Sequence, residues 1–270
     1  MILLYFFLFS LGAALGSFFA GFAVWQAVLV CLGAFVGVNL LYVIFWYAVA
    51  ATVDDTKPIE SQKPIYPFGC ASIAGWLCAW ARVHTTVQGE ELLPGEGRFV
   101  LVCNHLSKFD PIVTEYKLRK YNLSFISKPS NLKIKGIGKL AYGAGFLPIN
   151  RENDREALKT ILQAVDYLKR GLCSMVIYPE GTRSKTGELG PFHAGSFKIP
   201  QRAKVPLVIA AIRNTDQVGR NFPLRSTQVT LAILDVLSPE QVKAWSSTQE
   251  LAAYAHGRIE EYLRNQEARG

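Results

Sequence analysis

The stretch Phe99-Val-Leu-Val-Cys-Asn-His-Leu-Ser-Lys-Phe-Asp110-Pro111 sets the pattern of the whole chain. Its first five residues are apolar and prone to β-structure, so they predict a buried strand over 99–103. Asp110 and Pro111 are typical of an N-cap and a first helical residue, and they predict a helix over 111–120. The stretch therefore predicts a strand, a short loop and a helix, which is the repeating unit of an α/β fold.

The same alternation continues on both sides of this stretch. Further apolar runs predict strands over 84–88, 123–127, 146–149, 173–178, 206–212 and 228–236. Amphipathic patterns predict helices over 154–170 and 248–265. We therefore expect residues 83–270 to form an α/β domain in which a mixed, mostly buried sheet is flanked by helices.

The helix over 154–170 has the clearest pattern of its own. Asn153 or Asp154 is suited to cap it, and Gly171 is suited to end it. Residues at helical spacing predict the stripe that faces the core: Leu158, Ile161, Leu162, Val165 and Leu168.

The N-terminal part of the chain differs sharply from this domain. The protein has 270 residues and a net charge of +8, yet no charged side chain precedes Asp54. Residues 1–53 are long enough for two membrane helices, and we expect a hairpin with its tip at 23–26. In such a hairpin Gly12 and Gly16 lie level with Gly37 and Gly33, a pattern that favours close helix packing. Whether this hairpin spans the bilayer or dips into one leaflet is left open.

Residues 54–82 form a linker that contains a second apolar stretch over 64–81. Ile73, Trp76, Leu77 and Trp80 fall on one face of a helix there, which suits an interfacial helix or an ordinary core helix. The basic residues that follow the hairpin place the domain on the cytoplasmic side of the cell membrane, because cytoplasmic flanks are enriched in Lys and Arg.

Composition excludes several classes of protein. Apolar residues make up 50% of the chain, which argues against disorder. The five cysteines form no C-x-x-C pair, so neither a disulfide framework nor a zinc site is expected. We expect no metal.

His105 and Asp110 are the first candidates for chemistry. His105 follows a strand end, where α/β sheets carry reactive groups. An imidazole there accepts a hydroxyl proton if a carboxylate holds its other N–H. Alternatively, Asp110 only caps the helix that follows. Ser107 would complete a Ser-His-Asp set, whereas Cys103 is expected to pack in the core.

A second group of polar residues follows the strand over 173–178, in Tyr178-Pro-Glu-Gly-Thr-Arg-Ser184. The Arg183 fork binds phosphate, Thr182 adds a donor, and Gly181 lets backbone N–H groups approach. Arg151 and Lys128 also follow strand ends. Cations near a candidate base indicate a substrate with an anionic head.

Four motifs in order resemble the glycerolipid acyltransferases, and the bacterial 1-acyl-sn-glycerol-3-phosphate acyltransferases in particular. They are Asn104-His105-x4-Asp110, Gly145-Phe-x-x-Ile-Asn-Arg151, Tyr178-Pro-Glu-Gly-Thr-Arg-Ser184 and the Val205-Pro-Leu-Val-Ile run. The resemblance covers about residues 85–212. Tyr178 departs from the usual Phe, and Asn150 stands where Asp is often found.

The resemblance implies roles for individual residues. His105 is the catalytic base and Asp110 its partner. The glycerol phosphate head is held by Arg151, Glu180, Gly181, Thr182 and Arg183, with Asn104 and Lys128 added by position.

The implied reaction transfers an acyl chain from a thioester to the sn-2 hydroxyl of lysophosphatidic acid and makes phosphatidic acid for phospholipid biosynthesis. No cofactor is expected; acyl-coenzyme A or acyl-acyl carrier protein is the co-substrate, and the membrane lipids are partners. Two alternatives stay open. One is an acyltransferase for glycerol 3-phosphate, another lysophospholipid or an aminolipid. The other is a membrane-tethered module that binds anions without catalysis; nucleic acid is not expected as a partner.

Overall fold

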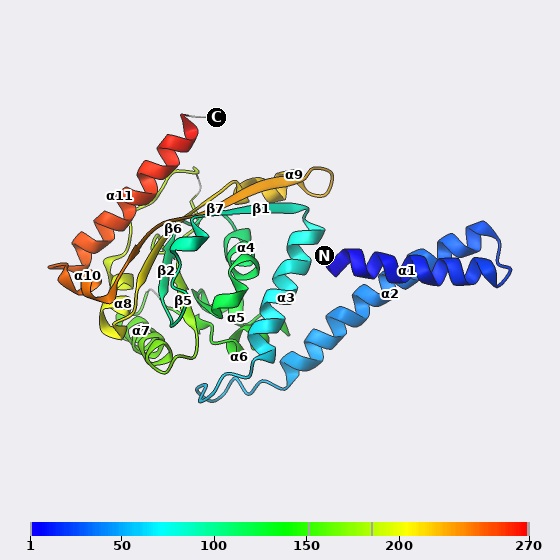
Figure 1. Ribbon diagram of the computed structural model, residues 1–270. Coiled ribbons are helices and arrows are strands. Elements are labelled where there is room, and N and C mark those ends of the chain that lie inside the picture. The colour runs from blue at the N-terminus through cyan, green and yellow to red at the C-terminus, as the bar shows by residue number, and fades with distance from the viewer. Residues whose placement is uncertain (1, 151, 185, 269–270) are drawn as a thin grey trace.

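The computed structural model describes residues 2–150, 152–184 and 186–268. All seven predicted apolar runs form strands of one sheet (Figure 1). Its strands are β1 (Val83–Gln88), β2 (Val100–Cys103), β3 (Leu123–Ser127), β4 (Leu147–Pro148), β5 (Ser174–Ile177), β6 (Leu207–Arg213) and β7 (Thr227–Leu237). Their order across the sheet is β1-β7-β6-β2-β5-β3-β4.

The direction of the strands decides where the functional groups meet. Strands β6, β2, β5, β3 and β4 are mutually parallel, so their carboxyl ends share one edge of the sheet. β7 runs antiparallel to β6, and β1 runs parallel to β7. The mixed sheet expected from the sequence is confirmed. The segments that follow β2, β3, β4, β5 and β6 all begin at this one edge.

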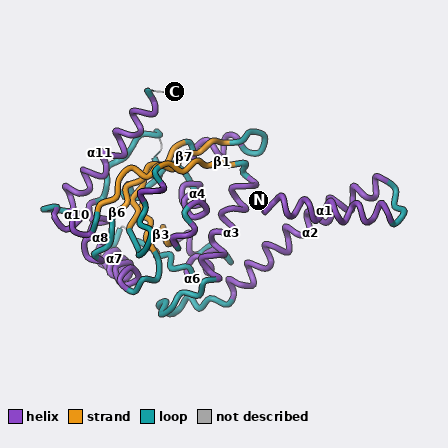
Figure 2. Tube along the Cα trace, in the orientation of Figure 1, coloured by secondary structure: helices purple, strands orange, loops and turns teal. Residues whose placement is uncertain are grey.

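Helices cover both faces of the sheet (Figures 1 and 2). One face packs against α7 (Asp154–Lys169), α8 (Lys198–Ala203) and α11 (Thr248–Glu267). The other packs against α3 (Ile65–Trp80) and α4 (Phe109–Lys117). The domain also contains short helices: α5 (Pro129–Leu132), α6 (Ile137–Gly143), α9 (Val218–Asn221), α10 (Pro239–Ala244) and the 3-10 turns η1 (Glu90–Leu92), η2 (Arg119–Tyr121), η3 (Ala194–Phe197) and η4 (Thr215–Gln217).

Helix α7 confirms its predicted ends and corrects its predicted face. The Asn153 side chain accepts hydrogen bonds from two backbone N–H groups of the first turn, as an N-cap does. Leu158 and Leu162 are 45% and 48% exposed, so this part of the predicted stripe is wrong. The buried positions include Thr160 and Ala164 instead. Thr160 is tolerated there because its hydroxyl donates to the carbonyl of Pro148 at 2.6 Å.

The first two helices form the expected hairpin, which extends away from the domain in Figure 1. By length and composition, α1 (Ile2–Phe19) and α2 (Val24–Ala51) are both able to cross a membrane. The predicted role of the four glycines is wrong, because a Cβ at Gly12, Gly16, Gly33 or Gly37 would meet no atom within 4 Å. These glycines therefore do not lie where the two helices touch.

Helix α3 joins the hairpin to the domain. Its Trp76 and Trp80 side chains both donate to the Oδ1 atom of Asn39 in α2, at 2.9 and 3.3 Å. A separate apolar cluster, which includes Trp46, Tyr66 and Leu140, connects α2, α3 and α6. The tryptophan face of α3 is therefore turned to the hairpin, and the end of α2 is fixed to the domain.

Candidate active site

The predicted base and its partner lie in contact at the shared edge of the sheet. The Nδ1 atom of His105 is 2.6 Å from Oδ2 of Asp110. Asp110 is fully buried, whereas the His105 side chain keeps 19% of its surface exposed. The carboxylate engages Nδ1, and it leaves Nε2 of the imidazole as the nitrogen that a substrate can reach.

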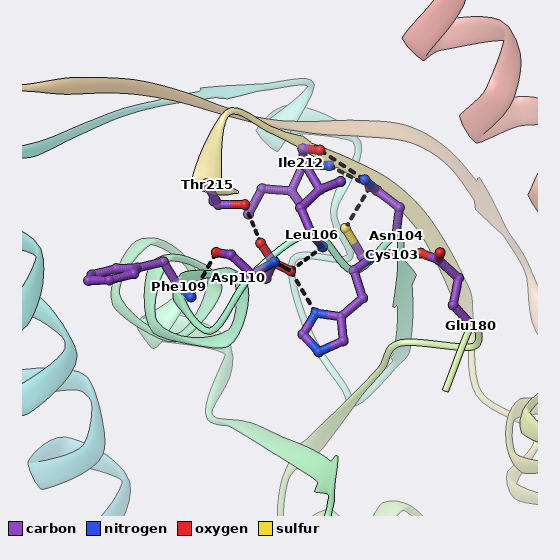
Figure 3. A network of polar contacts seen from close by, with 10 residues as sticks. Cys103, Asn104, Leu106, Phe109, Asp110, Glu180, Ile212 and Thr215 are labelled. Atoms are coloured by element: carbon purple, nitrogen blue, oxygen red, sulfur yellow. Dashed lines mark hydrogen bonds and ion pairs between the residues drawn. The ribbon is translucent and has the colours of Figure 1, made fainter. Parts of the chain in front are cut away.

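Asp110 is not the N-cap that the sequence predicts. Helix α4 begins at Phe109, so Asp110 lies inside the first turn and Lys108 stands at the cap without a capping side chain. The helix starts earlier because Ser107 Oγ accepts the Phe109 N–H at 3.0 Å. Asp110 Oδ2 instead accepts the N–H groups of Leu106 and Ser107, at 2.6 and 2.8 Å (Figure 3). The carboxylate thus holds the loop as well as the imidazole.

Thr215 completes the surroundings of this carboxylate, and the sequence does not single it out. Its hydroxyl donates to Oδ1 of Asp110, and the residue is 1% exposed (Figure 3). Thr215 begins η4 directly after β6, the strand beside β2. The order of the strands was the missing information, since it alone places the end of β6 next to Asp110.

Tyr178 is a second contact that the sequence leaves without a role. Its ring stacks on the His105 imidazole with centroids 4.4 Å apart and an angle of 19° between the planes. Tyr178 is buried, and burial raises its pKa well above the usual value. The ring therefore forms a fixed, neutral wall against one face of the imidazole.

Asn104 and Glu180 bind backbone where the sequence expected substrate contacts. The Asn104 amide accepts the Ile212 N–H at 2.8 Å and donates to the Ile212 carbonyl at 3.0 Å. Glu180 accepts the His105 N–H at 2.6 Å with one oxygen and the Gly190 N–H at 2.9 Å with the other. Burial raises the pKa of Glu180, and these backbone donors oppose the rise. Both side chains hold the chain around His105.

Gly181, Thr182 and Arg183 lie on a turn that is fastened to His105. Gly181 adopts a φ of +77°, and its N–H donates to the Tyr178 carbonyl. The Ser184 N–H donates to the His105 carbonyl at 2.8 Å, which brings the turn against the base. The Thr182 and Arg183 side chains are exposed, and neither makes a hydrogen bond within the described part of the chain.

The sequence also singles out Lys128, Arg151, Ser107 and Cys103. Lys128 follows β3 at the shared edge, and its side chain is exposed. Arg151 lies outside the described residues. Ser107 uses its hydroxyl on the Phe109 N–H, and Cys103 is fully buried with a pKa raised well above the usual value by burial. Among residues 2–150, 152–184 and 186–268, no group of three or more His, Cys, Asp or Glu side chains could hold a metal ion.

The arrangement suits proton abstraction from a hydroxyl group. An imidazole with Nδ1 on a buried carboxylate presents Nε2 as a general base. An arginine and a threonine on the adjoining turn offer donors to an anion, and Arg matches phosphate in a bidentate fork.

Comparisons with known proteins identify related acyltransferases. Residues 84–213 match the model of the Acyltransferase family. A 1-acyl-sn-glycerol-3-phosphate acyltransferase of Salmonella typhimurium is 30% identical over 169 residues, which cover 62% of this chain and 67% of that protein. One of Chlamydomonas reinhardtii is 33% identical over 172 residues, 62% of this chain and 51% of that protein.

A solved structure has the same fold. The crystal structure of the 1-acyl-sn-glycerophosphate acyltransferase PlsC from Thermotoga maritima matches with a TM-score of 0.63 and 22% identity, over 86% of this chain and 97% of that chain. Together with the bacterial relatives, the two apolar helices indicate association with a membrane. The chain belongs to the 1-acyl-sn-glycerol-3-phosphate acyltransferase family.

Proposed function

We propose that the protein transfers an acyl group from a thioester to the sn-2 hydroxyl of 1-acyl-sn-glycerol 3-phosphate and so makes phosphatidic acid. The observation that carries the proposal is the His105–Asp110 pair, because the carboxylate engages Nδ1 and leaves Nε2 for the substrate. The turn that carries the exposed Arg183 is bonded to the His105 backbone through Ser184. The names of the relatives support the same activity.

In the proposed mechanism His105 is the catalytic residue and Asp110 positions it. Nε2 takes the proton of the sn-2 hydroxyl as its oxygen attacks the thioester carbonyl. The tetrahedral intermediate then expels the thiolate, which recovers the proton from the imidazolium. The acyl group moves directly to the acceptor oxygen, so no acyl-enzyme forms. Asp110 stabilises the imidazolium throughout.

Arg183 and Thr182 bind the phosphate of the acceptor in this proposal. Their turn is bonded to the His105 backbone through Ser184, so phosphate binding sets the distance between the hydroxyl and the base. Arg151 and Lys128 are proposed to add to this site. Asn104 and Glu180, both expected from the sequence to bind substrate, act instead as positioning residues for the His105 loop.

The acyl donor is either acyl-coenzyme A or acyl-acyl carrier protein, and both are acidic partners for a chain of net charge +8. The mechanism uses no metal and no cofactor. The domain is proposed to lie on the cytoplasmic side of the cell membrane, where basic flanks are retained.

An acceptor comparison tests the proposal. Purified protein in detergent is offered lysophosphatidic acid, glycerol 3-phosphate, lysophosphatidylcholine or an aminolipid, each with either donor. We expect acylation of lysophosphatidic acid, and Arg183→Ala should raise its KM by roughly 10-fold or more, because a charged hydrogen bond contributes about 1.5–3 kcal/mol. Faster acylation of another acceptor, with KM unchanged in Arg183→Ala, would favour that acceptor. Lipid binding without consumption of either thioester would favour an anion-binding module.

A further inference from the structure

A pocket lies where the second membrane helix reaches the catalytic domain. It has a volume of about 610 Å³ and lies between the last turns of α2 and the segment Leu132–Lys139. Figure 1 shows α2 meeting the domain beside α6. The pocket shares no residue with the site around His105, so the acceptor site does not account for it.

The pocket carries a net positive charge. Lys133, Lys135 and Lys139 line it, together with a single carboxylate, Asp55. Asp55 lies 3.2 Å from the Lys139 Nζ atom. Lys133 and Lys135 form no ion pair with any carboxylate in the described ranges. Two ammonium groups are therefore available to an anion.

Exposed apolar and aromatic side chains lie around this pocket. Tyr47, in the closing part of α2, is 54% exposed, and Ile134 and Ile137 are each 51% exposed. Isoleucines that alternate with lysines suit a bilayer boundary, because the apolar groups enter the acyl region while the ammonium groups extend toward phosphates. Aromatic residues at the ends of membrane helices mark the same level.

The backbone holds the lysines in place. Gly136 adopts a φ of +76°, and a Cβ there would lie 2.6 Å from the Tyr47 ring. A Cβ on Gly138 would lie 2.1 Å from the carbonyl oxygen of Leu132. The segment is therefore packed tightly against itself and against α2. The backbone that carries these lysines therefore keeps a fixed relation to the membrane helix.

We propose that this pocket binds the phosphate headgroup of an anionic phospholipid of the surrounding bilayer. The occupant is a lipid and not a soluble protein, because the exposed isoleucines and the end of α2 surround the charges. The bound lipid fixes the tilt of the domain on the membrane. This inference does not depend on acyl transfer.

Native mass spectrometry of the full-length protein in detergent tests the proposal. Phosphatidylglycerol is titrated against phosphatidylcholine, with inorganic phosphate as a competitor. The wild type and His105→Ala should both retain one phosphatidylglycerol in preference to phosphatidylcholine, and millimolar phosphate should not displace it. Lys133→Gln/Lys135→Gln should weaken retention by about 10- to 30-fold, since each lysine near an anionic surface contributes about 1 kcal/mol.

Lys159→Gln/Lys169→Gln is the matched control, because both lysines are exposed on α7, away from the pocket. It should bind phosphatidylglycerol as the wild type does. Equal retention of the two lipids, or equal losses in the two double variants, would overturn the proposal. Displacement by inorganic phosphate would overturn the claim that the pocket is specific for a phospholipid. Because His105→Ala is inactive in the proposed mechanism, its lipid binding separates this result from any failure of the enzymatic proposal.

Discussion

At the residue scale, the site depends on which hydrogen-bond donors each oxygen of the buried Asp110 carboxylate accepts. Oδ2 of Asp110 accepts from His105 and from two loop N–H groups, and Oδ1 accepts from Thr215. The donors on Oδ2 hold the imidazole and the loop. The donor on Oδ1 comes from a distant part of the chain and moderates the negative charge that the imidazolium experiences.

Thr215→Val removes this donor and keeps the shape of the side chain. Without it Oδ1 of the buried Asp110 carboxylate lacks its donor, so the carboxylate holds His105 less firmly in place. We expect kcat/KM to fall. The rate at neutral pH should fall about 10-fold, because a hydrogen bond to a charged group contributes about 1.5 kcal/mol.

Thr215→Ser keeps the hydroxyl and should restore the wild-type rate in steady-state kinetics. If Thr215→Ser lost as much rate as Thr215→Val, the threonine would be a packing residue only.

Glu180→Gln tests the assignment of Glu180 to the backbone. A Gln side chain turns an NH₂ group toward the N–H of His105 or Gly190, so one buried donor loses its acceptor. We expect kcat to fall about 10-fold or more with KM for lysophosphatidic acid unchanged. Steady-state kinetics beside Arg183→Ala separate the two roles. A raised KM with unchanged kcat in Glu180→Gln would show that Glu180 binds the substrate.

The sequence predicts His105 and Asp110 because they lie five residues apart in one short segment between β2 and the first turn of α4. It misses Thr215 and the stacking role of Tyr178, because these depend on which strands are neighbours. It also assigns Glu180 and Asn104 to substrate, since a motif does not reveal that buried backbone N–H groups already occupy their side chains. Contacts within one short segment can thus be predicted from the sequence. Contacts between segments that follow different strands can be predicted only when the order of the strands is known.

At the element scale, helix α4 buries the carboxyl group of Glu115. Glu115 is 4% exposed, its Oε2 atom has no hydrogen-bond partner among the described residues, and burial raises its pKa to about 8. Glu115 is therefore neutral in the folded protein at neutral pH and ionised in the unfolded chain. The free energy of unfolding falls as the pH rises from about 4.5 to about 8.

Glu115→Gln should remove this part of the pH dependence. The wild type is expected to lose stability by about 1.4 kcal/mol for each pH unit from this group, and the variant should lose correspondingly less. Thermal unfolding in detergent at pH 5, 6, 7 and 8 measures the difference. Parallel curves for the two proteins would show that Glu115 is ionised in the folded state.

The Asn39 amide of α2 accepts hydrogen bonds from two tryptophans of α3. Asn39→Leu would leave the Trp76 and Trp80 N–H groups without their acceptor, so we expect the free energy of unfolding to fall by about 1–3 kcal/mol. Thermal unfolding in detergent is the measurement. Val36→Ala, on an exposed part of the same helix, is the control. Equal stability of Asn39→Leu and the control would show that the amide does not couple the helices.

The strands are the most predictable elements, because runs of β-branched and aliphatic residues buried on both faces have few other solutions. Helix faces are less predictable. In α7 the buried face includes Thr160, Ala164 and Tyr167, whereas two leucines face outward. The glycine pattern in α1 and α2 fails for a similar reason, since spacing alone does not show which faces of two helices meet.

At the scale of the whole molecule, charge and hydropathy divide the chain in the same way as its structure does. The uncharged first 53 residues contain the hairpin, and all 29 Lys and Arg residues lie beyond it, in the linker and the domain. The parallel strands bring the proposed base, its partners and the turn proposed to bind phosphate to one edge of the sheet. This arrangement explains how a membrane-associated protein acts on a lipid whose hydroxyl and phosphate lie close together.

The most direct test of this account is the formation of phosphatidic acid by purified full-length protein and by His105→Ala. Both are supplied with lysophosphatidic acid and, in separate reactions, with acyl-coenzyme A or acyl-acyl carrier protein. The account predicts product with at least one donor, and a rate at least ~100-fold lower in His105→Ala, because the general base is lost. A His105→Ala protein that folds normally and turns over at near wild-type rate would contradict the account.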